Sequence, residues 1–224
     1  MTPLEKTLDD VRVPPAVAAY RSAARIYDAA LEPPLRGMRR AVSALAGAGP
    51  GMRVLDVCCG TGKQARLLAD TGADVAAADM SPHMLLKARA RAGSRMNLLL
   101  ASADRLPFAD GAFDLVLNCL SLHEIPESLR HAFAAEMRRV ARPGGRIIIM
   151  DYGTPEKAGL ADLPFHSACR LAERAAGGAH YRNYRDWMAR DALRGFAARA
   201  GLNGQLHIYY GGAMNVLVAQ PAGS

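Results

Sequence analysis

Short apolar runs alternate with helix-compatible segments through the middle of this chain, and this alternation restricts the possible folds most strongly. Runs typical of strands occur at 53–58, 74–79, 97–101, 113–118 and 146–151, with helical segments expected near 63–71, 82–92 and 127–141. Strands that alternate with helices of this length form a parallel sheet, and right-handed crossovers put helices on both faces. The sequence therefore predicts an α/β fold with a doubly wound, mostly parallel sheet.

Two further apolar runs, 205–210 and 214–219, are joined by Gly211-Gly212 and little else. Such a short connection is typical of a hairpin, so we expect a seven-stranded sheet that ends in an antiparallel pair. A chain of 224 residues is expected to form a single domain. Its parts would be a helical N-terminal lid, a ligand-binding core, a substrate-side insertion, and a final helix with the hairpin, at 1–50, 51–151, 152–184 and 185–224.

The first apolar run leads through Asp56 into a tight turn, Cys58–Gly62, that precedes the first helical segment. A strand–turn–helix unit of this kind brings bare backbone close to a ligand at the carboxyl end of a parallel sheet. The second run ends in Asp79, 17 residues beyond Gly62. That offset is near the ~20 residues expected for a carboxylate that accepts hydrogen bonds from a ribose diol. The glycines alone would suit any nucleotide-like ligand.

Three later segments make the pattern more specific: Leu106-Pro107-Phe108, Phe113-Asp114-Leu115-Val116 and Arg142-Pro143-Gly144-Gly145-Arg146. Together with Asp56, the glycine turn and Asp79, they resemble the class I S-adenosylmethionine-dependent methyltransferases. Within that class the sequence is most similar to the small-molecule branch around the ubiquinone/menaquinone C-methyltransferases, from about Gly51 to Asp151. The resemblance implies a Rossmann-like methyltransferase fold, an enzyme that transfers a methyl group, and S-adenosylmethionine as its cofactor.

The resemblance also implies which residues bind the cofactor. The turn after the first strand would shape the pocket for the methionine portion, and Asp79 would bind the ribose hydroxyls. Met80 and the Ser102-Ala103 turn would meet the adenine, and the end of the fourth strand would line the floor near the sulfonium. The full cofactor-binding set is Asp56, Cys58, Gly60, Thr61, Gly62, Asp79, Met80, Ser102, Ala103, Asn118 and Leu120.

Two positions depart from the family pattern. Cys58 stands where the family has the first glycine of the turn, so the backbone there is less free to adopt a positive φ. Ser102 stands where an acid often contacts the adenine amino group, and Asp104 follows two residues later. Either Ser102 serves as the hydrogen-bond acceptor or that contact is absent.

His123 is the candidate catalytic residue, because it is the only histidine inside a motif, Leu120–Pro126. Its unperturbed pKa suits proton transfer near neutral pH, and the resemblance places it at the entrance to the substrate cavity. The alternative is a histidine that only hydrogen-bonds a nearby loop. Methyl transfer from a sulfonium is an in-line displacement with a good leaving group, so alignment and exclusion of water can suffice without a base.

The methyl acceptor is expected to be a small molecule held by the parts of the chain outside the family core. The substrate candidates are Tyr20, Tyr27, Tyr152, His166 and Tyr181. Tyr181 belongs to an aromatic and basic cluster at 180–187, which would suit an anionic or polar aromatic acceptor. An amphipathic helix whose aromatic residues pack in the core explains that cluster at least as well.

The net charge of +7 comes from arginines that are spread along the chain. Positive charge can attract nucleic acid or anionic lipid, but no basic stripe is interleaved with aromatic residues, so we expect no nucleic-acid partner. The basic charge and the apolar insertion support one alternative, methylation of a quinone or phospholipid head group at the membrane surface, with peripheral membrane contact. A non-catalytic protein that binds S-adenosylmethionine as a sensor or scaffold is the other.

The four cysteines show no C-x-x-C spacing and two of them are adjacent. This pattern argues against a zinc ribbon, a redox pair and a disulfide framework, so we expect no metal site. No apolar run approaches the ~18–20 residues needed to span a bilayer, and the N-terminus lacks the basic-then-apolar layout of a secretory signal. A cytoplasmic location is expected.

Overall fold

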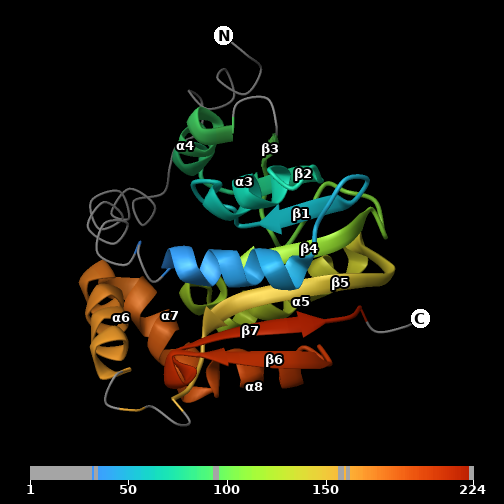
Figure 1. Cartoon of the computed structure of the whole chain (residues 1–224). Coiled ribbons are helices and arrows are strands. Elements are labelled where there is room, and N and C mark those ends of the chain that lie inside the picture. The colour runs from blue at the N-terminus through green and yellow to red at the C-terminus, as the bar shows by residue number, and fades with distance from the viewer. Residues whose placement is uncertain (1–31, 33–34, 93–95, 156–158, 160–161, 222–224) are drawn as a thin grey trace.

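A computed structural model of the chain describes residues 32, 35–92, 96–155, 159 and 162–221. Seven strands form one sheet in the order β3-β2-β1-β4-β5-β7-β6 (Figure 1). The first five are parallel, and β7 is antiparallel to both β5 and β6, which confirms the expected sheet and its terminal hairpin. The strands are β1 (Arg53–Val57), β2 (Asp74–Asp79), β3 (Met96–Leu100), β4 (Phe113–Cys119), β5 (Ala141–Tyr152), β6 (Gly204–Tyr209) and β7 (Met214–Ala219).

The order of the strands reverses at β1. β2 and β3 follow outward on one side of β1, whereas β4 and β5 lie on its other side. In open α/β sheets a ligand crevice forms at such a reversal, outside the carboxyl ends of the strands. β1 and β4 pair in parallel from Val54↔Leu115 to Val57↔Asn118, so the loops that follow these two strands border the same crevice.

Helices cover both faces of the sheet. The helix at 35–46 lies across the front of the sheet in Figure 1, and α5 and α8 lie behind it. α3 shares the front face, since the Gln64 side chain donates a hydrogen bond to the Ser43 hydroxyl (3.0 Å). The labelled helices are α3 (Lys63–Ala69), α4 (Pro82–Ala92), α5 (Glu127–Val140), α6 (Leu163–Ala176), α7 (Gly178–Ala189) and α8 (Ala192–Arg199), with 3-10 turns η1 (Leu122–Glu124) and η2 (Tyr210–Gly212).

The core lies between the sheet and these two helical layers. Val54 in β1 and Ile148 in β5 are fully buried, as are most of their apolar neighbours along the strands. Strands of a parallel sheet have such nearly continuous apolar runs because both of their faces are covered. On the helix at 35–46, the buried residues Met38, Val42 and Ala46 recur every fourth position and form the stripe that packs on the core.

β5 is longer than the apolar run at 146–151 indicated. It begins at Ala141, and its pairing with β4 shifts register between Phe113 and Leu115, so residues 142–145 bulge out of the ladder. A proline and two glycines give this bulge the composition of a turn, so the sequence does not predict that the strand begins before it, at Ala141.

Two helices, α6 and α7, occupy the segment after β5, where the sequence shows only weak periodicity. They lie beyond the carboxyl ends of the parallel strands (Figure 1). The inner face of α6 buries Cys169 and Glu173, and a buried carboxylate interrupts the apolar pattern that would mark a helix. α7 continues to Ala189, past the expected boundary between 184 and 185.

Arg130 joins α7 to the rest of the domain. This side chain of α5 is 1% exposed and donates hydrogen bonds to the carbonyls of Leu122 and Asn183, both at 3.0 Å. It also pairs with Glu127 (2.7 Å) and Asp186 (2.9 Å). One guanidinium therefore holds η1, α5 and α7 together.

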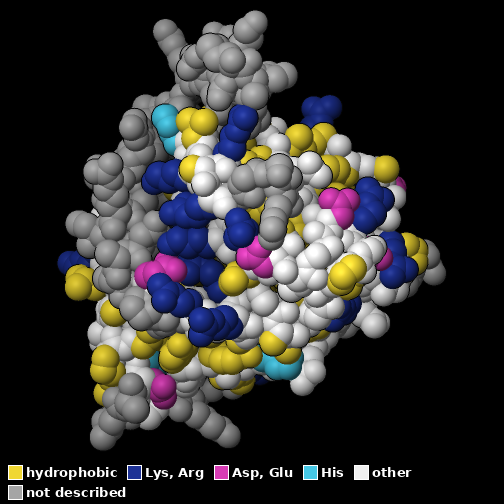
Figure 2. Space-filling model, turned by 45° about the horizontal axis from the view of Figure 1, so that its top comes forward, with side chains coloured by type: hydrophobic (Ala, Val, Ile, Leu, Met, Phe, Trp, Pro, Cys, Tyr) yellow, Lys and Arg dark blue, Asp and Glu magenta, His cyan; other side chains and the backbone are white. Residues whose placement is uncertain are grey.

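The surface carries the excess positive charge unevenly. Lys and Arg side chains gather in a band near the middle of the face in Figure 2, with few acidic groups among them. Other arginines are ion-paired, for example Arg66 with Asp70 (2.8 Å) and Arg190 with Asp186 (2.7 Å). Within the described ranges, no helix has the length and apolar character needed to cross a bilayer.

Candidate functional site

The turn after β1 has an unusual backbone at the point where the strand order reverses. Cys58, Gly60 and Gly62 all adopt left-handed conformations, with φ of 58°, 54° and 73°. A Cβ placed on Gly60 would meet nothing within 4 Å, so the turn borders open space there. A Cβ on Gly62 would lie 2.9 Å from the Cβ of Ala88, so the second glycine is required by the close approach of α4. The first glycine exposes backbone to a ligand, and the second permits packing.

Cys58 keeps the geometry that its family resemblance would assign to glycine. Its φ of 58° lies in the left-handed region, although a Cβ there costs roughly 1–2 kcal/mol. Two backbone hydrogen bonds enforce the turn, from Cys59 N–H to the Ala78 carbonyl (3.0 Å) and from Gly62 N–H to the Cys59 carbonyl (2.9 Å). The substitution therefore adds local strain and leaves the path of the chain unchanged.

Asp79 connects this turn to the end of β2. Its carboxylate accepts hydrogen bonds from the backbone N–H groups of Gly60 (2.7 Å) and Ser81 (2.8 Å). An ionised carboxylate offers about four lone-pair positions, so two remain for further donors. Burial raises the pKa of Asp79, while these two N–H groups oppose the shift. The group is positioned to accept hydrogen bonds from a polar ligand above the turn.

Asp56 lies beneath the same turn and is 1% exposed. Its Oδ2 has no hydrogen-bond partner among the described residues. Burial raises the pKa of the Asp56 carboxyl to about 8, and repulsion from Asp79 adds to the shift. The Ala65 backbone opposes this shift through a hydrogen bond to the carboxyl, but the other oxygen is buried and unpartnered. The site therefore favours a ligand that supplies positive charge or a donor, because such a ligand would restore the ionisation of Asp56. The methionine portion of S-adenosylmethionine, with an ammonium and a sulfonium, has the chemistry that this site lacks.

The groups expected around the adenine come together at the ends of β2 and β3. Asp79 pairs with Leu100 across the two strands, so the Ser102-Ala103 turn follows directly beside Met80. Met80 is 61% exposed, which leaves its side chain available to cover a flat ring. The Ser102 hydroxyl donates a hydrogen bond to Asp104 and keeps its own lone pairs, whereas Ala103 is buried. Ser102 thus can accept a hydrogen bond where the family has an acid.

Asn118 and Leu120 lie where β4 leaves the sheet. The Asn118 side chain is fully buried and donates to the Val57 carbonyl (2.9 Å) and the Ser121 hydroxyl (2.7 Å), so it braces β1 against β4. Leu120 is half-buried and has a φ of 56°, held by a hydrogen bond from its N–H to the Met150 carbonyl (2.8 Å). Both residues therefore lie at the carboxyl end of β4, next to the end of β1.

His123 on η1 lies among carboxylates and is 1% exposed. Its Nδ1 is 2.7 Å from Oδ1 of Asp151, a fully buried residue at the end of β5. Burial disfavours the charged imidazolium, but the carboxylates of Asp151, Glu173 and Glu124 outweigh it and raise the pKa of His123 to about 10. At neutral pH the ring therefore holds its proton and is poorly suited to accept another.

Glu173 and His180 complete this cluster; His180 belongs to the aromatic and basic segment at 180–187 that the sequence singled out, whereas Glu173 was not a candidate. The Tyr152 hydroxyl donates to Oε1 of Glu173 (2.9 Å), and His180 Nε2 pairs with its Oε2. Burial opposes ionisation of Glu173, but His123 and His180 outweigh it and lower its pKa. A sequence signal did exist: a single acid, Glu173, on the apolar face of a short helix.

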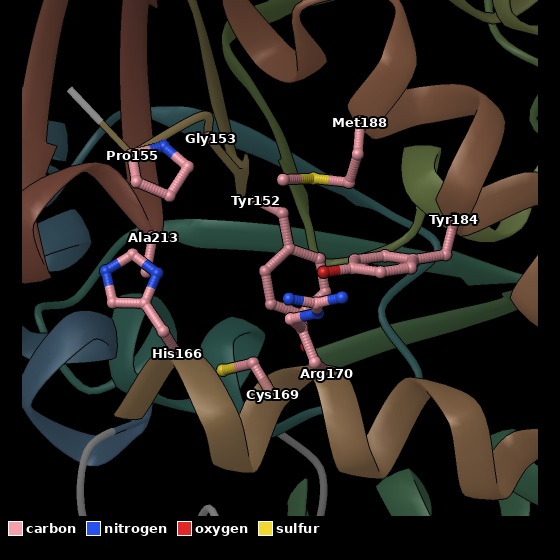
Figure 3. A pocket seen from close by; sticks show the side chains of 9 residues that line it. All are labelled: Tyr152, Gly153, Pro155, His166, Cys169, Arg170, Tyr184, Met188 and Ala213. Carbon is pink, nitrogen blue, oxygen red and sulfur yellow. The ribbon is translucent and has the colours of Figure 1, made fainter. Parts of the chain in front are cut away.

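A cavity of ≈ 50 Å³ lies beside this cluster, between α6, α7 and the end of β5 (Figure 3). In Figure 3 the side chains of Tyr152, Tyr184 and Arg170 converge, and His166 lies across from them. His166 is further held by a contact of its Nε2 with the Tyr210 carbonyl (3.0 Å). The lining residues are Tyr152, Gly153, Pro155, His166, Cys169, Arg170, Tyr184, Met188 and Ala213.

Two of the five expected substrate residues, Tyr152 and His166, thus line the same cavity. Tyr181 is not among the described residues that line it, because its ring stacks on Tyr184 with centroids 6.2 Å apart. Tyr20 and Tyr27 lie outside the described residues. The cavity adds Arg170, Tyr184 and Met188, whose positions depend on how α6 and α7 pack.

Comparisons with known proteins agree with this geometry. Residues 54–145 match the family model of a methyltransferase domain. Demethylmenaquinone methyltransferase of Beutenbergia cavernae is 39% identical over 142 residues, which cover 61% of this chain and 57% of that protein. The enzyme of the same name from Mycolicibacterium paratuberculosis is 37% identical over 141 residues, covering 63% of this chain and 59% of that one. The chain therefore matches somewhat more than half the length of these relatives.

Solved structures show the same fold. A SAM-dependent methyltransferase from Aquifex aeolicus superposes with a TM-score of 0.59 at 21% identity, over 82% of this chain and 89% of that one. A putative methyltransferase from Bacillus halodurans gives a TM-score of 0.57 at 25% identity, over 76% and 71% of the two chains. The chain shares the fold of these solved methyltransferases, and its residues 54–145 match the model of a methyltransferase domain.

Proposed function

We propose that this protein transfers a methyl group from S-adenosylmethionine to a small aromatic acceptor of the quinone class. The observation that supports the donor most strongly is the pair of buried carboxylates, Asp56 and Asp79, beneath an open left-handed turn where the strand order reverses. The quinone class is supported by the names of the demethylmenaquinone methyltransferases that match the chain.

In this proposal the cofactor lies across the carboxyl ends of β1, β2 and β4. Asp56 and the Gly60-Thr61-Gly62 backbone hold its methionine portion, and Asp79 accepts hydrogen bonds from the ribose hydroxyls through its remaining lone pairs. Met80 and Ser102 contact the adenine, and Asn118 with Leu120 support the sulfonium side. The bound cofactor supplies an electrophilic methyl group.

The protein's own contribution is to align the acceptor and exclude water. The cavity of ≈ 50 Å³ is too small for a quinol ring, so the acceptor would bind outside it, beside the exposed Arg170 of its lining. The Arg170 guanidinium would stabilise an ionised hydroxyl of the quinol, which makes the ring carbon beside that hydroxyl more nucleophilic. That carbon would form the new C–CH₃ bond as the C–S bond breaks, and the ring proton would leave to water. We assign His123 no role as a base, since its proton is held among three carboxylates.

Incubation of the full chain with S-adenosylmethionine and a reduced prenylated naphthoquinone, followed by mass spectrometry, tests this proposal. A product heavier by one methyl group is expected, together with S-adenosylhomocysteine. Arg170→Met should lower kcat and keep cofactor affinity, whereas Arg174→Met, on an exposed position of the same helix, should change neither. If S-adenosylhomocysteine fails to bind in calorimetry, the donor is wrong. Binding without turnover of any quinol would support the sensor alternative.

We further propose a cytoplasmic protein that meets the membrane surface, because prenylated quinones partition into bilayers. The net charge of +7 would favour anionic lipid. Co-sedimentation with vesicles of anionic phospholipid at low salt, and its loss at high salt, is the expected result. The absence of co-sedimentation at low salt would contradict the membrane contact and leave the methyl-transfer proposal intact.

A further inference from the structure

We propose that His123, Glu124 and His180, together with Glu173, bind a divalent transition-metal ion, with zinc as the best match. One ligand atom from each of His123, Glu124 and His180 lies within 4.8 Å of the others. The four residues come from three separate segments: η1, α6 and α7. A search for cysteine spacing in the sequence could not detect such a site.

The buried side of the His123 ring has room for a ligand bond at Nε2. Nε2 is buried and has no hydrogen-bond partner within the part of the chain that the structure describes. It is aimed at carboxylate oxygens of Glu173 (3.6 Å) and Glu124 (3.8 Å), which are too distant for a hydrogen bond. A buried ring nitrogen left unpaired costs free energy, and a metal ion between these atoms would satisfy it.

The other ring nitrogen of His123, Nδ1, is bound to a carboxylate. Asp151 Oδ1 lies 2.7 Å from Nδ1 and also accepts a hydrogen bond from the Tyr152 N–H (2.7 Å). A carboxylate bound to one ring nitrogen orients the imidazole and raises the basicity of the other nitrogen. This carboxylate–histidine pair is the arrangement found behind histidine ligands in metal sites.

The spacing of the donors fits a small cation. Zinc binds histidine nitrogen and carboxylate oxygen at about 2.0–2.2 Å, so tetrahedral donors lie roughly 3.3–3.6 Å apart. Nε2 of His123 is 3.6 Å from Glu173 Oε1, and His180 Nδ1 is 3.9 Å from Glu124 Oε2. The ligand atoms of His123, Glu124 and His180 lie within 4.8 Å of one another, so side-chain movements of up to about 1 Å would bring them to this spacing.

The charge of the cluster points to a cation as well. Three carboxylates, Asp151, Glu124 and Glu173, converge on two imidazoles in a largely buried volume. With neutral imidazoles the set carries a formal charge of −3, which a divalent ion reduces to −1. Two nitrogen and two oxygen donors suit zinc, and zinc exceeds manganese and iron in intrinsic affinity for such sets.

A bound ion would fix α6 and α7 to η1, and with them the cavity residues Arg170 and Tyr184. The site is separate from the cofactor groups on β1 and β2, so the inference does not depend on which molecule is methylated. Metal loading is therefore expected to raise the melting temperature of the full chain and to slow hydrogen exchange in α6 and α7.

Zinc titration of the full chain, freed of metal with a chelator, tests the proposal by calorimetry and by the zinc content after gel filtration. We expect one zinc per chain. Glu124→Gln and His180→Gln should each weaken binding at least about 10-fold and abolish the rise in melting temperature. His131→Gln is the matched control, since His131 is 53% exposed on α5 and lies outside the cluster. Circular dichroism would show that the variants are folded.

Cobalt distinguishes this site from binding by cysteine. Cobalt-loaded protein should show only ligand-field bands, because nitrogen and oxygen donors give no intense thiolate-to-cobalt absorption. An intense thiolate band would place the metal on a cysteine and overturn the proposal. A wild-type chain that retains no zinc, or Glu124→Gln and His180→Gln variants that bind as tightly as the control, would also overturn it.

Discussion

Replacing Asp56 with asparagine removes a buried carboxyl group that the folded protein holds in its neutral, protonated form. The pKa of Asp56 rises from 3.8 to about 8, first through burial and then through Asp79. Because the folded state binds this proton more tightly than the unfolded state, the stabilisation is complete below about pH 4 and is lost as the pH rises through 8. At 1.36 kcal/mol per pKa unit, the full shift from 3.8 to about 8 corresponds to about 6 kcal/mol.

Asp56→Asn should therefore flatten the dependence of stability on pH. In the absence of cofactor, the free energy of unfolding of the wild type should fall between pH 5 and pH 9. The variant should lose much less, and it should exceed the wild type at pH 9 by up to about 6 kcal/mol. Urea denaturation at pH 5, 7 and 9 measures this difference. Asp74→Asn, at the exposed start of β2, is the control and should behave as the wild type.

The same variant should distinguish the charged cofactor from its product. S-adenosylmethionine carries one more positive charge than S-adenosylhomocysteine, so loss of the Asp56 carboxylate should weaken binding of the first more than that of the second. Parallel stability curves for Asp56→Asn and the wild type between pH 5 and 9 would refute the reasoning, since they would mean that the buried carboxyl ionises freely.

Three further predictions concern neighbouring features. Asp79→Ala should weaken binding of S-adenosylhomocysteine in calorimetry by about 1–3 kcal/mol, the cost of unpairing buried hydroxyl partners, and Asp74→Ala should leave this binding unchanged. Equal affinities of the two variants would contradict the role of Asp79 at the ribose. Cys58→Val should lower the free energy of unfolding by about 1–2 kcal/mol, because a β-branched residue fits a φ of 58° poorly, whereas Cys58→Gly should not lower it. A valine variant as stable as the wild type in urea would argue against backbone strain at residue 58. Arg130→Met should lower the free energy of unfolding in urea by about 3 kcal/mol, because it leaves two carbonyls and two carboxylates without their buried partner. Arg182→Met, at an exposed position on α7, should have little effect, and similar losses of stability in both variants would show that the buried contacts contribute little.

The sequence determined the sheet and the neighbourhood of the residues expected to bind the cofactor. Strand and helix periods are local properties, so the alternation of apolar runs was sufficient to predict a parallel sheet and its terminal hairpin. The turn at 58–62 and Asp79 belong to consecutive units of strand and helix. Their separation in sequence therefore limits their separation in space, and the structure brings them together, with the Gly60 N–H donating to the Asp79 carboxylate (2.7 Å).

Only the tertiary structure decided the region around His123. Its partners, Asp151, Glu173 and His180, lie 28 to 57 residues further along the chain and meet only where α6 and α7 fold over the carboxyl end of the sheet. A pKa depends on burial and on charges within a few ångströms, and neither is a local property of the sequence. For this reason the motif predicted that His123 is a base, whereas in the folded protein its ring is protonated and lies among carboxylates.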